Sequence, residues 1–75
     1  MGRKLPVISG RKAARAFERG GWTFDRQKGS HMIYVKAGVR VNLSIPDHRE
    51  LDTGTLRGLI RASGLTVDDF LALLP

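Results

Sequence analysis

The chain has 75 residues, a formal net charge of +6 and no cysteine. A domain of this size hides only about 60% of the surface that its unfolded chain exposes, so its hydrophobic core must be small. The lack of cysteine excludes disulfides and thiolate metal sites as supplements to that core. The longest apolar run, residues 70–74, is too short to span a bilayer. We therefore expect a single soluble, cytoplasmic domain over residues 1–75 that makes no use of a membrane.

The positive charge is concentrated in the first forty residues. Residues 1–40 contain ten lysine or arginine residues against two acidic ones, a net charge of +8, whereas residues 41–75 contain three against five, a net charge of −2. This polarity suits the docking of one side of the protein against a phosphate backbone. A generic solubilising surface would give the same composition, so charge alone leaves both interpretations open.

The first predicted element is a short amphipathic helix over residues 10–19. Ser9 is a suitable N-cap, because its hydroxyl can accept a hydrogen bond from a free N–H of the first turn. Gly20 and Gly21 can end the helix, since glycine adopts the left-handed conformation without a steric penalty. Helical spacing places apolar residues on one side and basic residues elsewhere: Ala13, Ala16 and Phe17 against Arg11, Lys12, Arg15 and Arg19.

Three strands are predicted next from the alternation of side chains along the chain. The first covers residues 22–27, where we assign Trp22 and Phe24 to the core. The second covers residues 31–36. The third covers residues 39–45 and has the clearest alternation, with four apolar side chains pointing inward: Val39, Val41, Leu43 and Ile45.

Two more helices are predicted after a polar connector at residues 46–52. The first begins at a cap on Thr53 or Thr55 and runs to about Ser63. The second begins at Thr66, with an aspartate in position for a capping box. Their inward-facing residues recur at helical spacing: Leu56, Leu59 and Ile60 in the first, and Val67, Phe70, Leu71 and Leu74 in the second.

The order of these elements, α-β-β-β-α-α, predicts an α+β fold. Turns at residues 28–30 and 37–38 are short, and consecutive strands with short connections form an antiparallel meander. One face of such a sheet is apolar and needs cover, which the helices can supply. We therefore expect a three-stranded antiparallel sheet with helices packed on one face.

One histidine follows directly after a Gly-Ser turn, at the start of the second predicted strand. An imidazole has an unperturbed pKa of about 6.5, so His31 is a candidate for acid or base chemistry near neutral pH. A histidine at the start of a strand is more often structural than catalytic. The residues alone leave both interpretations open.

A series of short motifs runs in order along the chain. It consists of Gly21-Trp22, Arg26-Gln27-Lys28, Gly29-Ser30-His31, Tyr34, Ile45-Pro46, His48, Gly54-Thr55-Leu56-Arg57 and Ile60-Arg61-Ala62-Ser63-Gly64-Leu65. This ordered set, from about Ser9 to Leu65, resembles the HicA family of bacterial toxins. Two stretches depart from the family pattern, namely the extended connector from Asp47 to Asp52 and the tail beyond Leu65.

The resemblance implies an α-β-β-β-α fold related to double-stranded-RNA-binding domains. It also implies endoribonuclease activity on mRNA and inhibition by a cognate HicB-type antitoxin within a type II toxin-antitoxin system. We expect no cofactor. In the family, the histidine of the Gly-Ser-His turn is the catalytic residue. That role carries over to His31.

RNA cleavage without a metal needs a base that takes the proton of the 2′-hydroxyl and an acid that protonates the leaving 5′-oxygen. We predict that His31 serves in this chemistry. Gly29 and Ser30 would let the backbone approach the phosphate closely. Positive charge for the transition state would come from Lys28, Arg26 and Lys36.

Two other residues have alternative interpretations. His48 is either a second acid or base that works with His31, or a solvated residue of the connector. Tyr34 either stacks on a base of the RNA or packs within its strand. We expect no metal site, because two histidines without cysteine, among scattered Asp and Glu, match no ligand spacing.

Two other functions fit the composition. The main alternative is a non-catalytic double-stranded-RNA-binding module, but such modules carry a lysine cluster at the start of their last helix, where this chain offers Arg57 and Arg61. The third candidate is a basic adaptor that acts through protein partners, without a salt-sensitive affinity for RNA. Cleavage of single-stranded RNA in the presence of EDTA separates the toxin from both.

Overall fold

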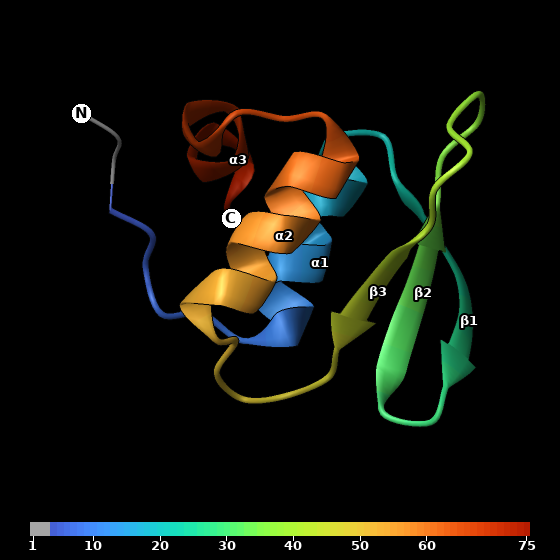
Figure 1. The fold of residues 1–75 in the computed structure, drawn as a ribbon, viewed down its shortest axis with the longest axis horizontal. Helices are drawn as coiled ribbons and strands as arrows, with labels where there is room; N and C mark the ends of the chain where they lie inside the picture. Colours follow the sequence, from blue (N-terminus) through green and yellow to red (C-terminus); the bar gives the residue numbers. More distant parts are fainter. Residues whose placement is uncertain (1–3) are drawn as a thin grey trace.

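A computed structural model describes residues 4–75 and shows the helices and strands in the predicted order (Figure 1). The strands form one antiparallel sheet in the order β1-β2-β3. The helices lie together on one side of this sheet and leave its other side uncovered, so the predicted α+β class is confirmed. The elements are α1 (Gly10–Arg19), β1 (Thr23–Lys28), β2 (His31–Val35), β3 (Leu43–Pro46), α2 (Thr53–Ser63) and α3 (Val67–Leu73).

The hydrophobic core lies between the helices and the inner side of the sheet. Phe17 of α1 and Phe70 of α3 are fully buried, with their ring centroids 5.1 Å apart, so α3 belongs to the same core as α1. Trp22, just before β1, is buried as predicted. None of the helices in residues 4–75 has the length and hydrophobicity needed to cross a membrane. The sheet contributes Met32, Tyr34, Leu43 and Ile45 to the core.

The ends of α1 and α3 form as their sequences predict. Ser9 Oγ accepts a hydrogen bond from the N–H of Lys12 at 3.0 Å, and Gly21 takes φ +98° just after α1. Thr66 and Asp69 form both hydrogen bonds of a capping box at the start of α3. These local signals therefore fix where the two helices begin and where α1 stops.

The N-cap of α2 differs from the prediction. Asp52, rather than Thr53 or Thr55, is the cap, and its carboxylate accepts the N–H of Thr55 at 3.4 Å. Leu51 is buried in the core, which anchors the chain immediately before Asp52 and places that carboxylate beside the free N–H groups of the first turn. The helix still ends at Gly64 in the left-handed conformation, as predicted.

The first strand differs most from the prediction, because every side chain of β1 is exposed. Phe24, which we assigned to the core, is 48% exposed and packs only edge-on against Tyr34, with ring centroids 5.7 Å apart. The helices pack over β3 and over the inner side of β2 but leave β1 outside the core (Figure 1). The assignment of Phe24 to the core was therefore wrong.

The third strand is shorter than predicted. It begins at Leu43, and Val39 and Val41 are 38% and 50% exposed rather than buried. Residues 36–42 form an arm that extends beyond the end of the sheet, with a turn in which Gly38 takes φ +80° (Figure 1). Alternating apolar side chains need an opposing surface to be buried, and Val39 and Val41 lie outside the core that the helices form.

The connector at residues 46–52 lies across the start of α1, and we call it the strap. The N–H of Gly10 donates a hydrogen bond to the carbonyl oxygen of His48 at 2.9 Å. A Cβ on Gly10 would lie 1.8 Å from the carbonyl oxygen of Pro46, so the contact requires glycine. The strap therefore fixes the end of β3 against the N-terminus of α1.

Candidate active site

His31 lies on the face of the sheet that the helices leave uncovered, which we call the outer face. Met32 and Tyr34 belong to the core, so the alternation along β2 turns the side chain of His31 the opposite way. Its cross-strand partners are Lys28 in β1 and Pro46 in β3, and directly paired residues share a face. The exposed imidazole thus has a lysine beside it and solvent in front of it.

A β-bulge brings a second cation to the outer face. The pairing of β1 with β2 shifts between Phe24 and Arg26, which leaves Asp25 without a partner in the sheet. The extra residue reverses the alternation, so Phe24 faces the helix side while Arg26 faces outward with Lys28 and His31. Arg26 is then a diagonal neighbour of His31. Its guanidinium forms an ion pair with the carboxylate of Asp25.

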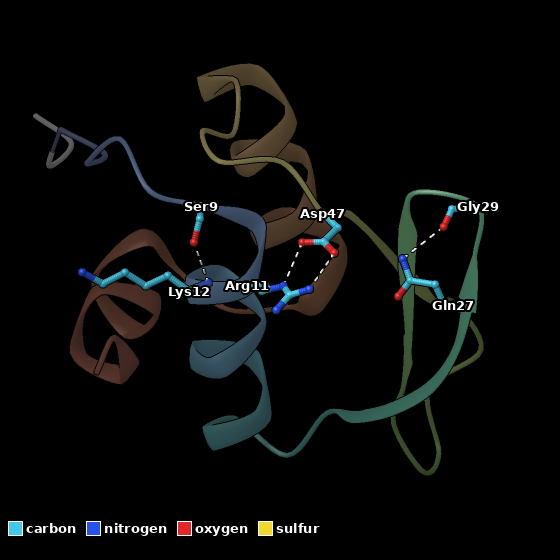
Figure 2. Close-up of polar contacts among 6 residues, drawn as sticks. All are labelled: Ser9, Arg11, Lys12, Gln27, Gly29 and Asp47. Carbon is cyan, nitrogen blue, oxygen red and sulfur yellow. Dashed lines mark hydrogen bonds and ion pairs between the residues drawn. The ribbon is translucent and has the colours of Figure 1, made fainter.

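The turn before His31 is held by hydrogen bonds to both of its carbonyl groups. Gly29 takes φ +58°, the left-handed value that a type II′ hairpin turn needs at its first central residue. Gln27 Nε2 donates to the carbonyl oxygen of Gly29 at 3.1 Å (Figure 2). The N–H of Asp47 donates to the carbonyl oxygen of Ser30 at 2.8 Å. Ser30, the residue before His31, remains exposed.

An ion pair that the sequence does not signal connects this turn to α1. Arg11 Nε and Nη2 donate to Asp47 Oδ1 and Oδ2 at 3.1 and 3.3 Å (Figure 2). These hydrogen bonds lower the pKa of the Asp47 carboxyl and raise the pKa of the Arg11 guanidinium. The two residues are 36 positions apart, so no local spacing could reveal the contact. Asp47 thus joins the Ser30 carbonyl on one side to α1 on the other.

Lys36 and Tyr34, two of the predicted site residues, do not accompany the imidazole. Lys36 directly follows the far end of β2. At roughly 3.3 Å per residue, it lies about 16 Å from His31. Its Nζ donates a hydrogen bond to the carbonyl oxygen of Gly20 at 3.1 Å. Tyr34 is 4% exposed, and its hydroxyl donates to Glu18 at 2.7 Å. Burial, followed by this bond, raises the pKa of Tyr34 to about 12. The buried ring favours packing over stacking on a base.

His48 is exposed but lies on the side of α1 rather than beside His31. Its carbonyl group is bound to the N-terminus of α1, and its side chain lines a hollow of about 350 Å³. His31 does not line this hollow, so the two imidazoles do not share it. The other residues that line this hollow are Ser9, Arg11, Asp47 and Arg49.

The outer face combines an exposed imidazole, two cations and an open turn. Cations beside an imidazole attract an anionic group, and the imidazole can exchange a proton with that group. Across residues 4–75, no cluster of three or more His, Asp or Glu side chains is placed to hold a metal ion. The arrangement suits proton transfer at a bound phosphodiester.

Comparison with known proteins identifies the family. The sequence profile of a family described as the HicA toxin of bacterial toxin-antitoxin systems matches residues 10–65, from the start of α1 to the residue after the α2 C-cap. No curated protein gives a significant match to the chain. The profile covers well over half of the sequence and leaves out α3. The chain therefore belongs to the HicA family of toxins from bacterial toxin-antitoxin systems.

Proposed function

We propose that this toxin belongs to a type II system and is an endoribonuclease that cleaves mRNA by metal-independent acid-base catalysis at His31. The observation that carries the proposal is the position of His31. Its imidazole lies exposed on the outer face, directly across from Lys28 and diagonal to Arg26. Membership of the toxin family supports a toxic activity. The geometry of the outer face supports a polyanionic substrate.

The proposed reaction is attack of a ribose 2′-hydroxyl on the adjacent phosphate. The new bond from the 2′-oxygen to phosphorus replaces the bond to the 5′-oxygen and leaves a 2′,3′-cyclic phosphate. His31 either accepts the 2′-proton, while water protonates the 5′-oxygen, or protonates the 5′-oxygen, while water accepts the 2′-proton; an imidazole can serve in either role near neutral pH. Lys28 and Arg26 stabilise the negative charge that grows on the phosphate oxygens in the transition state. Gly29 and Ser30 let the phosphate approach the backbone, and the exposed Ser30 hydroxyl can donate a hydrogen bond to it.

A cognate HicB-type antitoxin is the proposed protein partner. Membership of a toxin-antitoxin family implies an antitoxin, and a basic outer face would attract an acidic partner surface. Such a surface, laid across Lys28 and His31, would block access of RNA to the imidazole. Inhibition that survives neutralisation of the acidic residues on the partner would contradict this mode of binding.

The test is cleavage of a 5′-labelled single-stranded RNA in the presence of EDTA by the purified protein and its His31→Ala variant. The exposed imidazole makes no side-chain hydrogen bond or ion pair within residues 4–75, so its loss should change the free energy of unfolding by less than about 0.5 kcal/mol. We expect the variant to fold, to bind RNA and to lose cleavage. Undiminished cleavage by His31→Ala would refute the proposal.

His48→Ala is the matched control, because it removes the other exposed imidazole of the chain. Since His48 lies on the α1 side, we expect this variant to cleave at a rate close to that of the parent. A non-catalytic double-stranded-RNA-binding module would instead bind RNA without cutting it, whichever histidine is present.

A further inference from the structure

We propose that a second cationic surface, beside the N-terminal half of α1, binds the part of the RNA chain that flanks the cleaved bond. We call it the α1 surface. The inference extends the proposed function, because it assigns a place to RNA beyond the outer face. The surface consists of Arg11, Lys12, Arg15 and Arg49.

Three adjoining hollows give the α1 surface its shape. Arg11 lines all three of them, so they adjoin one another along α1 and the strap. The first, of about 280 Å³, includes Lys12 and Arg15. The second, of about 230 Å³, lies between α1 and the sheet. The third, of about 350 Å³, includes Arg49 and His48.

The second hollow connects the α1 surface to the catalytic turn. Gln27 lines this hollow, and its side chain donates a hydrogen bond to the carbonyl oxygen of Gly29. Asp47 also lines it and bonds to the carbonyl oxygen of Ser30. In Figure 2, Lys12, the ion pair of Asp47 and the turn at Gly29 follow one another across the molecule. A nucleic-acid strand that leaves the turn therefore meets the α1 surface next.

Three cations of this surface are available to a ligand. Lys12, Arg15 and Arg49 are exposed, and within residues 4–75 their side chains form no hydrogen bond or ion pair. The first turn of α1 contains no acidic residue, although the helix dipole favours negative charge there. Lys12, which has no ion-pair partner within residues 4–75, therefore opposes the dipole in that turn. A bound phosphate would remove this repulsion.

The chemistry of the lining favours RNA over a protein partner. Protein interfaces centre on apolar and aromatic side chains. In the described chain the exposed large apolar residues are Val7, Phe24, Val39 and Val41, and none of them lines the three hollows. Exposed cations without an exposed large apolar residue among them are typical of contacts with a phosphate backbone.

The experiment compares two triple variants that lose the same charge, each in a His31→Ala background so that RNA stays intact. The first, Lys12→Gln, Arg15→Gln and Arg49→Gln, removes the unpaired cations of the α1 surface. The second, Arg40→Gln, Arg57→Gln and Arg61→Gln, removes exposed cations of the arm and α2. Glutamine keeps a high helix propensity. For each variant, the association constant K is measured at several salt concentrations, once with a 20-nucleotide single-stranded RNA and once with a tetranucleotide.

We expect the first variant to lose affinity for the 20-mer and the second to behave like its parent. Each lost phosphate contact lowers the slope of log K against log salt by about 0.7, so the slope should fall by about 2. At 0.1 M salt this corresponds to roughly a fivefold loss per contact and about a hundredfold loss in all. The tetranucleotide, which can occupy only the turn, should bind all variants alike.

Equal slopes for the two triple variants would overturn the inference. The inference would also fail if the first triple variant lost as much affinity for a 20-residue poly-glutamate peptide as for the RNA, because the surface would then bind acidic proteins in general. If the triple variant unfolds, Arg49→Gln alone, which lies outside any helix, should still lower the slope by about 0.7. Failure of the proposed function is distinct, since the parent with His31 intact would then bind RNA without cutting it.

Discussion

Replacing Gly10 by alanine tests how closely the strap is held against α1. A Cβ at this position would lie 1.8 Å from the carbonyl oxygen of Pro46, whereas ordinary contacts begin at 3.4 Å. The helix and the strap must therefore move apart by about 1.6 Å, the difference between these two distances. This movement would also strain the hydrogen bond from the N–H of Gly10 to His48, which is 2.9 Å long.

The magnitude follows from two opposing effects. Overpacking of a close contact costs roughly 1–3 kcal/mol, and alanine in place of glycine in a helix regains about 0.5–1 kcal/mol. The net loss in the free energy of unfolding is therefore about 1–2 kcal/mol. In a domain of this size each kcal/mol lowers the melting temperature by about 4–8 °C. We expect Gly10→Ala to melt roughly 5–15 °C below its parent.

Thermal unfolding followed by circular dichroism measures this change, with Gly58→Ala as the matched control. Gly58 is exposed in the middle of α2, and a Cβ there would meet nothing within 4 Å. Its replacement should raise the stability by about 0.5–1 kcal/mol, since only the helix propensity changes. Replacing glycine by alanine should thus lower the stability at Gly10 and raise it at Gly58. A Gly10→Ala protein that melts at or above its parent would refute the close contact.

Two further predictions concern an ion pair and the core. The Arg11 hydrogen bonds hold the pKa of Asp47 below its ordinary value of 3.8, so the stabilisation from the ionised carboxylate is present above about pH 4 and is lost as the pH falls through the lowered pKa. At pH 7, Asp47→Asn should therefore have a lower melting temperature than its parent. This difference in melting temperature should shrink as the pH is lowered below 4. A difference that is unchanged at pH 2 would contradict the pairing. Phe17→Ala should cost roughly 3–5 kcal/mol, whereas Phe24→Ala, at a half-exposed ring, should cost about 1 kcal/mol. If urea unfolding showed similar losses in the free energy of unfolding for these two variants, the position of β1 outside the core would be contradicted.

Local signals in the sequence predicted most of the fold. Ser9, Gly21 and the capping box at Thr66 act through hydrogen bonds or backbone angles within a few residues, and such features can be recognised from spacing alone. Burial depends instead on what lies opposite a strand. Val39 and Phe24 alternate correctly with their neighbours, but the helices do not extend over them.

The site was predictable only where it is local. The turn at Gly29 and the imidazole that follows it are contiguous in the sequence and were found there. The bulge at Asp25 was not, because a single extra residue leaves the composition of a strand unchanged. The pairing of Arg11 with Asp47 joins segments 36 residues apart and depends on the completed fold.

The uncovered position of β1 has a consequence for how the protein moves. No part of β1 is buried, so its attachment depends mainly on its ladder with β2 and on the hydrogen bonds at the turn. Segments with few buried apolar contacts open at a lower free energy than the core. Backbone amides of β1 should therefore exchange with deuterium sooner than those in the buried half of the sheet. The strand that carries Arg26 and Lys28 would then be the part of the protein that a bound ligand protects most.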